Sequence, residues 1–162
     1  MFSEKMKIFT DKIMSSALIM LMGLMVLNVT WQVLSRYLLQ SPSSFTDELS
    51  RYMLIWLGML GAAYVAGQNQ HLAIDIVLRR LEGQAKARLQ LLINVLIIFF
   101  ALIAMVFGGS NLVYITMMLG QKSATLQIPL AIVYGIIPFS GLLVIYYQLV
   151  FIFQMMRTSK GI

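Results

Sequence analysis

The sequence predicts an all-α membrane protein with four transmembrane helices, and three observations support that fold class. Three runs without a formal charge, residues 13–35, 89–121 and 123–156, each exceed the roughly 20 apolar residues that cross a bilayer core. A fourth run, residues 49–67, contains one charge, Arg51, in its first turn, where a long side chain can reach the headgroups. Hydrophobic residues make up 60% of the chain and charged residues 11%, a composition typical of membrane proteins.

We expect a single domain, residues 1–162, because the chain holds no repeat, low-complexity tract or dividing linker. Lysines precede the first apolar run, as they do in a secretory signal. That run is too long for a signal and lacks a cleavage site, so an uncleaved first helix is expected. The approximate spans are 13–37, 47–67, 87–118 and 129–156.

The distribution of basic residues predicts the orientation of the chain. Nine of them lie before the first span, between the second and third spans, or after the fourth, and three lie on the other side: Arg36, Arg51 and Lys122. Because basic loops stay in the cytoplasm, both termini are predicted to be cytoplasmic (N-in/C-in). The net charge of +6 then reflects orientation and contact with anionic membrane lipids. Nucleic-acid binding is not expected, because no basic stripe is interleaved with aromatic residues.

The first span and the turn after it carry boundary signals. Trp31 and Tyr37 suit the aromatic belt near the outer end of the span. Pro42 prevents the first helix from continuing. Ser44 and Asp47 resemble a capping box with Asp in place of the usual Glu or Gln, so the second helix is expected to begin there.

A compact ionic cluster is predicted at the outer boundary, formed by Arg36, Asp47, Glu48 and Arg51. The two acidic residues occupy the first turn of the second helix, where negative charge is favoured, and Arg51 follows them by one helical turn. Two interpretations stay open. The cluster either caps and anchors the helices, or pairs across an interface with another protein.

Small residues recur along the second helix at Gly58, Ala62 and Ala66, with Gly61 in the same region. Helices associate in lipid through close backbone approach, so this stripe predicts a tight crossing with a helix of this chain or of a partner. Trp56 lies too deep for the aromatic belt and is expected to pack against protein, with lipid contact as the alternative.

A short amphipathic helix is predicted over residues 71–82. His71, Asp75 and Arg79 fall on one polar stripe, and apolar residues cover the opposite side. Such a helix lies in the cytoplasmic interface plane. It is either a plain surface connection or an arm that grips a partner or lipid.

The third and fourth runs each contain a site where the helix is expected to be irregular. A helix over residues 89–121 would be about 48 Å long, so it must tilt, protrude or break, and residues 108–111 are the expected weak point. The fourth helix is expected to begin near Pro129 and to kink midway at Pro138, between Gly135 and Gly141. Such a break binds ions in some transporters, but a simple bend is the more ordinary interpretation.

Residues for catalysis are scarce. His71 is the only histidine and cysteine is absent, which excludes histidine-rich metal sites, thiolate sites and disulfides. No phosphate-binding glycine loop followed by Lys and Ser or Thr is present. The middle thirds of all four spans lack ionisable residues, whereas proton-coupled carriers usually place one there. We therefore expect no enzyme, cofactor or metal site, and a chain that supports transport by another protein. A sodium site built from backbone carbonyls is not addressed by this reasoning.

Several segments together resemble the small membrane subunit (Q-type, DctQ-like) of tripartite ATP-independent periplasmic (TRAP) transporters. They are Trp31-Gln-Val-Leu-Ser-Arg36-Tyr37, Phe45-Thr-Asp47-Glu48-Leu-Ser-Arg51-Tyr52, Trp56, Gly61-Ala-Ala63, His71 and Asp75. The motifs cover residues 31–80, and the topology covers the whole chain. Members of that family often have Trp followed by paired Glu before the helix-two Arg, where this chain has Phe45-Thr-Asp47-Glu48.

The resemblance implies a scaffold subunit in the bacterial inner membrane. A large permease subunit, forming a heterodimer with this chain, would carry organic acid (sialic acid or C4-dicarboxylate) and bind sodium. A periplasmic substrate-binding protein would deliver the substrate, and phospholipid can bind at the interface. By position, Arg36, Asp47, Glu48, Arg51 and Tyr52 would form the periplasmic-side interface, and residues 71–82 the cytoplasmic arm.

Two other functional classes stay open at this stage. A self-sufficient homo-oligomeric transporter or channel is disfavoured by the lack of charge inside the spans. A membrane enzyme or quinone-linked subunit would need ligands or thiols that the sequence lacks.

Overall fold

The computed structural model describes residues 2–41, 43–68 and 83–159, and its regular elements there are all helices. Four of the helical stretches are long and apolar enough to cross a membrane: Met6–Tyr37, Ser44–Gly67, Ala85–Met118 and Leu130–Met156. The predicted all-α class with four spans is therefore confirmed. The elements are α1 (Phe2–Tyr37), α2 (Ser44–Gly67), α4 (Gly83–Phe100), the π-helical segment η1 (Ala101–Gly108), α5 (Gly109–Met118), α6 (Leu130–Tyr134) and α7 (Ile136–Ser159).

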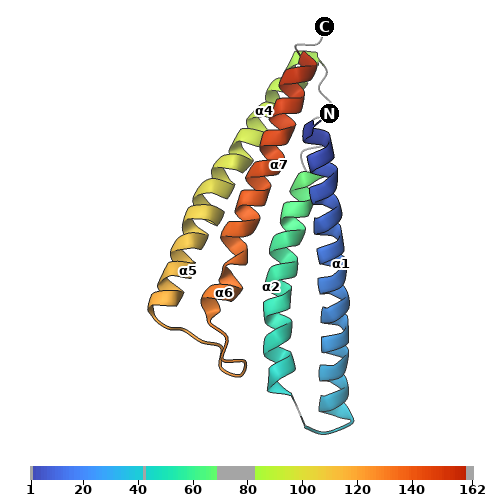
Figure 1. The fold of residues 1–162 in the computed structure, drawn as a ribbon, viewed down its shortest axis with the longest axis vertical. Coiled ribbons are helices and arrows are strands. Elements are labelled where there is room, and N and C mark those ends of the chain that lie inside the picture. Colours follow the sequence, from blue (N-terminus) through green and yellow to red (C-terminus); the bar gives the residue numbers. More distant parts are fainter. Residues whose placement is uncertain (1, 42, 69–82, 160–162) are drawn as a thin grey trace.

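The helices lie roughly side by side, in the spatial order α1, α2, α7 and then the continuous helix α4–η1–α5 (Figure 1). The beginning of α1 and the end of α7 lie at one end of the molecule, which we call the terminal end. The α1–α2 turn and the α5–α6 loop lie at the opposite end, which we call the loop end. The pair α1–α2 and the pair α5–α6 diverge toward the loop end, and the α5–α6 loop extends back toward the beginning of α2.

The first helix begins earlier than its approximate predicted span, and the second begins where it was expected but without the predicted cap. Helix α1 begins at Phe2 and not near residue 13, because the lysine-containing segment continues the helix beyond the apolar run. Helix α2 begins at Ser44 with Ser43 as its N-cap, and the Ser43 side chain makes no capping hydrogen bond. The predicted capping box is therefore not formed. The Asp47 carboxylate bonds Gln32 and Arg51 and is engaged away from the helix start.

The expected weak point at residues 108–111 is not a break. The backbone remains helical from Gly83 to Met118, and the irregularity is the wider π-helical turn of η1, just before those residues. The helix ends at Met118, and Gly120 two residues later has a φ of +58°, which suits glycine. There the amides of Gly120 and Gln121 donate to the carbonyls of Met117 and Thr116, a Schellman arrangement.

The fourth span is interrupted at Gly135, between α6 and α7. The interruption lies close to the beginning of this span and not midway. Pro138 has no N–H to donate to the carbonyl one turn earlier, which explains an irregularity just before it. Pro129 directly precedes α6 as its N-cap, close to the predicted start.

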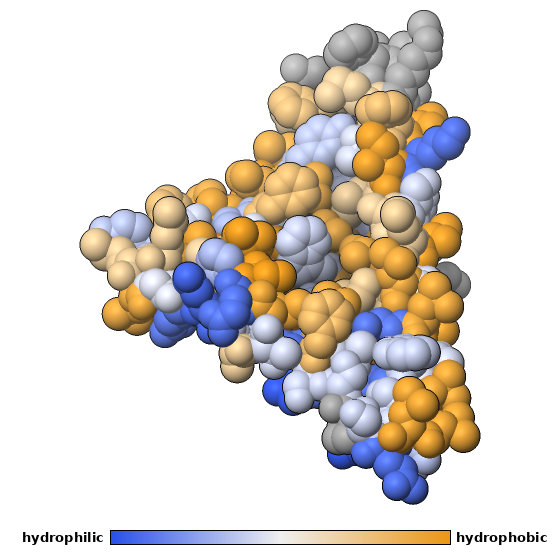
Figure 2. Space-filling view, turned by 60° about the horizontal axis from the view of Figure 1, so that its bottom comes forward, coloured by the Kyte–Doolittle hydropathy of each residue, from blue (hydrophilic) through white to orange (hydrophobic). Residues whose placement is uncertain are grey.

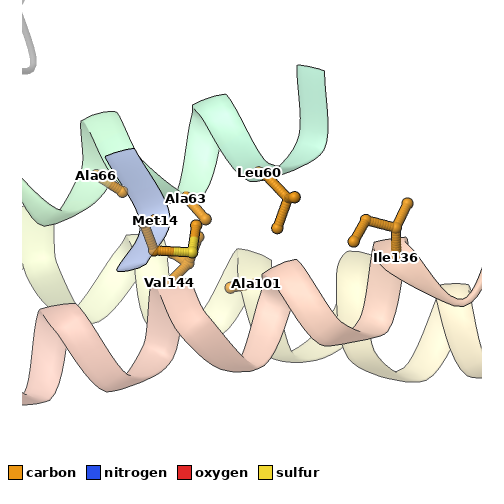
Figure 3. Close-up of a cluster of buried hydrophobic side chains, with 7 residues drawn as sticks. All are labelled: Met14, Leu60, Ala63, Ala66, Ala101, Ile136 and Val144. Carbon is orange, nitrogen blue, oxygen red and sulfur yellow. The ribbon is translucent and has the colours of Figure 1, made fainter. Parts of the chain in front are cut away.

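A small hydrophobic core joins all the long helices at mid-length (Figure 3). Ala63 and Ala101 have no exposed surface, so α2 and the third helix approach α7 closely. The seven buried residues of the core are Met14, Leu60, Ala63, Ala66, Ala101, Ile136 and Val144. The chain covers little else of its apolar surface: 6% of residues in the most apolar stretch of α1 are buried, and 39% in that of the fourth span. Most apolar surface is thus left for lipid or another protein.

The predicted cytoplasmic arm, residues 71–82 with His71, Asp75 and Arg79, lies outside the described residues. It stays a prediction.

Candidate interface at the loop end

The loop end gathers polar side chains between broad hydrophobic flanks, as Figure 2 shows from that side. These side chains form two groups of contacts and line one open hollow. Glu48 and Tyr52 hold the α5–α6 loop, a row of polar residues joins α1 to α2, and a hollow beside that row is open to the outside.

Glu48 fastens the α5–α6 loop to α2. Its Oε1 accepts a hydrogen bond from the amide of Ala124 at 3.1 Å. Its Oε2 accepts from the amides of Thr125 at 2.8 Å and Leu126 at 3.1 Å. The Tyr52 hydroxyl donates to Oε1 at 2.8 Å from one turn along α2. Successive backbone N–H groups in a turn form an anion-binding concavity, and here the anion is a carboxylate of the same chain.

The loop that Glu48 holds is itself closed by backbone hydrogen bonds. The amide of Ser123 donates to the carbonyl of Ile128 at 2.9 Å, and that of Leu130 to the carbonyl of Gln121 at 3.0 Å. Gln127 adopts a positive φ of 55° that lets the chain reverse. The turn over residues 123–127 therefore presents its amides to Glu48 in a defined geometry.

The second group of contacts is a polar seam between α1 and α2. The Asn28 amide donates to the Thr46 carbonyl and to the Ser50 hydroxyl, each at 2.8 Å. The Gln32 amide donates to Asp47 Oδ1 at 3.0 Å. Asp47 also pairs with Arg51, the one ion pair found among the described residues. Asp47 thus links α1 to a cation on the surface of α2.

The predicted four-residue ionic cluster is accordingly divided in two. Glu48 contacts neither arginine and serves the loop instead. Arg36 is exposed and forms no ion pair within residues 2–41, 43–68 and 83–159. It lines a hollow of about 370 Å³ together with Asp47 and Arg51; the other lining residues are Gln32, Ser43 and Ser44. An exposed arginine without a partner beside a polar hollow suits contact with an acidic group of another molecule.

The small-residue stripe predicted on α2 divides in a similar way. Ala66 is buried in the core, and Trp56 donates its indole N–H to the Val133 carbonyl of α6 at 3.1 Å. Gly58 and Gly61 have open space where a Cβ would lie, with no described atom within 4 Å. Ala62 is also exposed. Within the part of the chain that the structure describes, no tight crossing forms at these three residues, so the predicted crossing there stays a prediction.

The close helix crossings are formed by glycines that the sequence reasoning did not single out as packing sites. A Cβ on Gly141 would lie 2.7 Å from Met105 Cβ of η1. One on Gly109 would lie 2.9 Å from Pro138 Cδ, and one on Gly67 2.7 Å from the Tyr147 ring. In the sequence, nothing marked these three residues as packing sites except that each is a glycine close to a proline, an aromatic residue or another small residue.

The terminal end is held by a separate polar contact between the first and last helices. The Tyr147 hydroxyl donates to Asp11 Oδ1 at 2.7 Å, and the Tyr147 side chain is fully buried. The Lys7 ammonium lies 4.4 Å from the centre of the Phe151 ring, a cation–π contact. These two contacts hold the N-terminal part of α1 against the C-terminal part of α7.

Among the described residues, no three His, Cys, Asp or Glu side chains gather as a metal site requires. Asn28, Gln32 and Ser50 form hydrogen bonds between α1 and α2 that sequence reasoning missed. The signal for two of them was present, because Asn28 and Gln32 lie one turn apart on an otherwise apolar helix.

Comparison with known proteins identifies the family of this chain. A profile of the DctQ component of tripartite ATP-independent periplasmic transporters matches residues 12–158. The sialic acid TRAP transporter small permease protein SiaQ of Vibrio cholerae is 27% identical over 146 residues, which cover 88% of this chain and 80% of the relative.

Two Haemophilus influenzae proteins, both provisionally named TRAP transporter small permease proteins, are also similar. One is 31% identical over 90 residues, 56% of each chain, and the other is 25% identical over 108 residues, 67% of this chain and 65% of the relative. Each match therefore spans less than two thirds of the H. influenzae protein. These relatives are named as transporter subunits. Because the profile covers nearly the whole chain, this protein belongs to the DctQ family of TRAP transporter components.

Proposed function

We propose that this chain is the small scaffold subunit of a sodium-coupled TRAP transporter for an organic acid, and that it braces the large permease subunit that carries the substrate. The observation that carries the proposal is the sparse burial of four long apolar helices in a member of the DctQ family. A helix that covers so little of its own surface needs lipid or protein around it. A large membrane subunit supplies such a surface.

A supporting role agrees with the distribution of charge. The middle thirds of the four spans contain no Asp, Glu, Lys, Arg or His. Ions and protons that cross a membrane usually meet ionisable or carbonyl groups at mid-depth. In our proposal substrate and sodium bind the large subunit, and this chain has no cofactor of its own. The similarity to the V. cholerae sialic acid protein favours an organic acid such as sialic acid, with C4-dicarboxylates as the related class.

The family and the four apolar helices indicate a multi-pass protein of the bacterial inner membrane. We further propose that both termini lie in the cytoplasm, since nine basic residues would face that side and three the other. The loop end then faces the periplasm. Membrane lipids surround the chain, and nucleic acid is not a partner.

With that orientation, the loop end has two roles in our proposal. Glu48 and Tyr52 keep the α5–α6 loop in place within the chain. Arg36 and the Asp47–Arg51 ion pair border the open hollow, where they would contact the partner subunit. The periplasmic substrate-binding protein is reached mainly through the assembled complex. The predicted arm over residues 71–82 would grip the partner or lipid on the cytoplasmic side.

The test of the proposal is gentle extraction of the tagged chain from native membranes, followed by identification of the proteins that copurify in stoichiometric amount. We expect one large polytopic membrane protein in a 1:1 ratio. Recovery of the chain only as a homo-oligomer would contradict the proposal and favour a self-sufficient small transporter or channel.

A further inference from the structure

One face of α5 carries polar side chains that the chain leaves without hydrogen bonds. Ser110, Asn111 and Tyr114 are exposed, Tyr114 to 58% of its surface. None of the three side chains bonds any residue within the described ranges, and all lie inside the span Ala85–Met118. We call these three residues the polar α5 face.

The polar α5 face points away from the rest of the chain. Tyr114 follows Ser110 by four residues and Asn111 by three, which places all three on one side of the helix. On the other side, Gly109 is buried against Ile137 and Pro138 of α7. Thr116 is buried as well. No rearrangement of side chains alone would bring the polar α5 face into contact with α6 or α7.

Several other polar side chains on the spans bond groups of the chain, although Asn94 Nδ2, the Tyr146 hydroxyl and Gln148 Oε1 are buried without a hydrogen-bond partner among the described residues. The exposed Thr30 hydroxyl donates to the Val26 carbonyl of its own helix at 2.7 Å, and Thr116 donates in the same way to the carbonyl of Leu112. The amides of Asn28 and Gln148 donate to groups of a neighbouring helix. The exposed Asn111 amide, by contrast with those of Asn28 and Gln148, bonds neither its own helix nor another among the described residues.

The missing hydrogen-bond partner of Asn111 is costly where lipid tails surround this part of the helix. Asn111 lies seven residues before Met118, where the span ends, which is about 10 Å along the helix axis. Hydrocarbon offers no hydrogen-bond partner, so an Asn111 amide that faces lipid tails is unfavourable without a partner. A group from another protein removes that cost.

We propose that the polar α5 face docks on a transmembrane helix of the large permease subunit, with the Asn111 amide hydrogen-bonded to a polar group of that helix. This inference rests on the proposed function and adds to it the surface that meets the partner. An amide both donates and accepts, so the partner group is a hydroxyl, an amide or a free backbone carbonyl. Ser110 is small enough to let the two backbones approach. Exposed Phe107 adds apolar contact area one turn before Asn111.

The first test locates the contact by photocrosslinking in the assembled complex. Phe107 is replaced by p-benzoylphenylalanine, which keeps an aromatic ring next to an intact Asn111, and Leu27 of α1, which is 69% exposed, is the control position. We expect a crosslink from position 107 to the large subunit. Crosslinks only to a second copy of this chain or to lipid, from a complex that still copurifies, would overturn the docking surface and leave the proposed function standing. Failure of the unmodified chain to copurify with a large subunit would instead contradict the proposed function.

The second test measures the hydrogen bond. Asn111→Leu keeps the side-chain size and removes the amide, and Thr30→Val removes an exposed hydroxyl that is already bonded within α1. One interhelical hydrogen bond in a membrane corresponds to about 3-fold to 20-fold in association. We expect that loss of the association constant for Asn111→Leu, measured by titration of labelled subunits in mixed micelles, and no change for Thr30→Val. Equal affinity of the Asn111→Leu chain and the unmodified chain would overturn the inference.

Discussion

Replacing Gly141 by alanine tests the central packing contact of the fold. Gly141 lies on α7 opposite η1, and a Cβ placed there would be 2.7 Å from Met105 Cβ, 3.1 Å from Val106 Cγ2 and 3.4 Å from the Ala101 carbonyl oxygen. Met105 Cβ is fixed to its backbone and cannot rotate away. The added methyl group therefore forces α7 and η1 apart.

The size of the effect follows from that distance. Carbon atoms in contact prefer a separation of about 3.5–4.0 Å, so the helices must separate by roughly 1 Å. Overpacking of this kind costs about 1–3 kcal/mol, and in lipid no hydrophobic effect between helices offsets the lost van der Waals contacts. We expect the folding equilibrium constant to fall by about 5-fold to 150-fold.

The assay is reversible unfolding in mixed micelles of a mild detergent and SDS, followed by tryptophan fluorescence. Trp56 reports on the core because it bonds the Val133 carbonyl. Gly23→Ala is the matched control, since no described atom lies within 4 Å of a Cβ at Gly23. Equal stability of Gly141→Ala and Gly23→Ala would refute the proposed packing of α7 on η1.

Three further predictions concern the polar contacts. Glu48→Gln replaces two acceptor oxygens by one, so hydrogen exchange of the amides at residues 124–126 should accelerate while that of the core helices stays the same; unchanged exchange would contradict the fastening role. Tyr147→Phe removes the hydrogen bond to the Asp11 carboxylate and should lower the free energy of unfolding by about 1.5–3 kcal/mol, measured in the same mixed micelles; a stability equal to that of the unmodified chain would argue against this contact. Asp47→Ala should reduce recovery of the complex on copurification and leave apparent substrate affinity unchanged, and an intact complex with altered substrate affinity would show that the assigned role is wrong.

The four-helix class was predictable because it depends on properties that the sequence displays directly. Runs of apolar residues longer than a bilayer core need no tertiary information. The irregularity before Pro138 was predictable for a similar reason, since proline lacks the amide that a helix interior requires. Its position at Gly135 was less well predicted, because the exact residue depends on how α7 packs on η1.

The contacts of the loop end were only partly predictable. Glu48 was grouped with Arg51 because they lie one turn apart, but its carboxylate meets amides that lie 76 to 78 residues further along the chain. Local spacing cannot reveal such a partner. The π-helical turns of η1 were also missed, since they accommodate close approach to Gly141 and have no local sequence signal of their own. Asn28 and Gln32 could have been found as a polar stripe on an apolar helix.

The division of labour between this chain and its partner is tested most directly by transport in proteoliposomes. Vesicles contain this chain alone, the large permease subunit alone, or both, and uptake of labelled organic acid is driven by a sodium gradient in the presence of the periplasmic substrate-binding protein. The account predicts accumulation when both membrane subunits are present and none with this chain alone. Accumulation by vesicles that contain only this chain would contradict it.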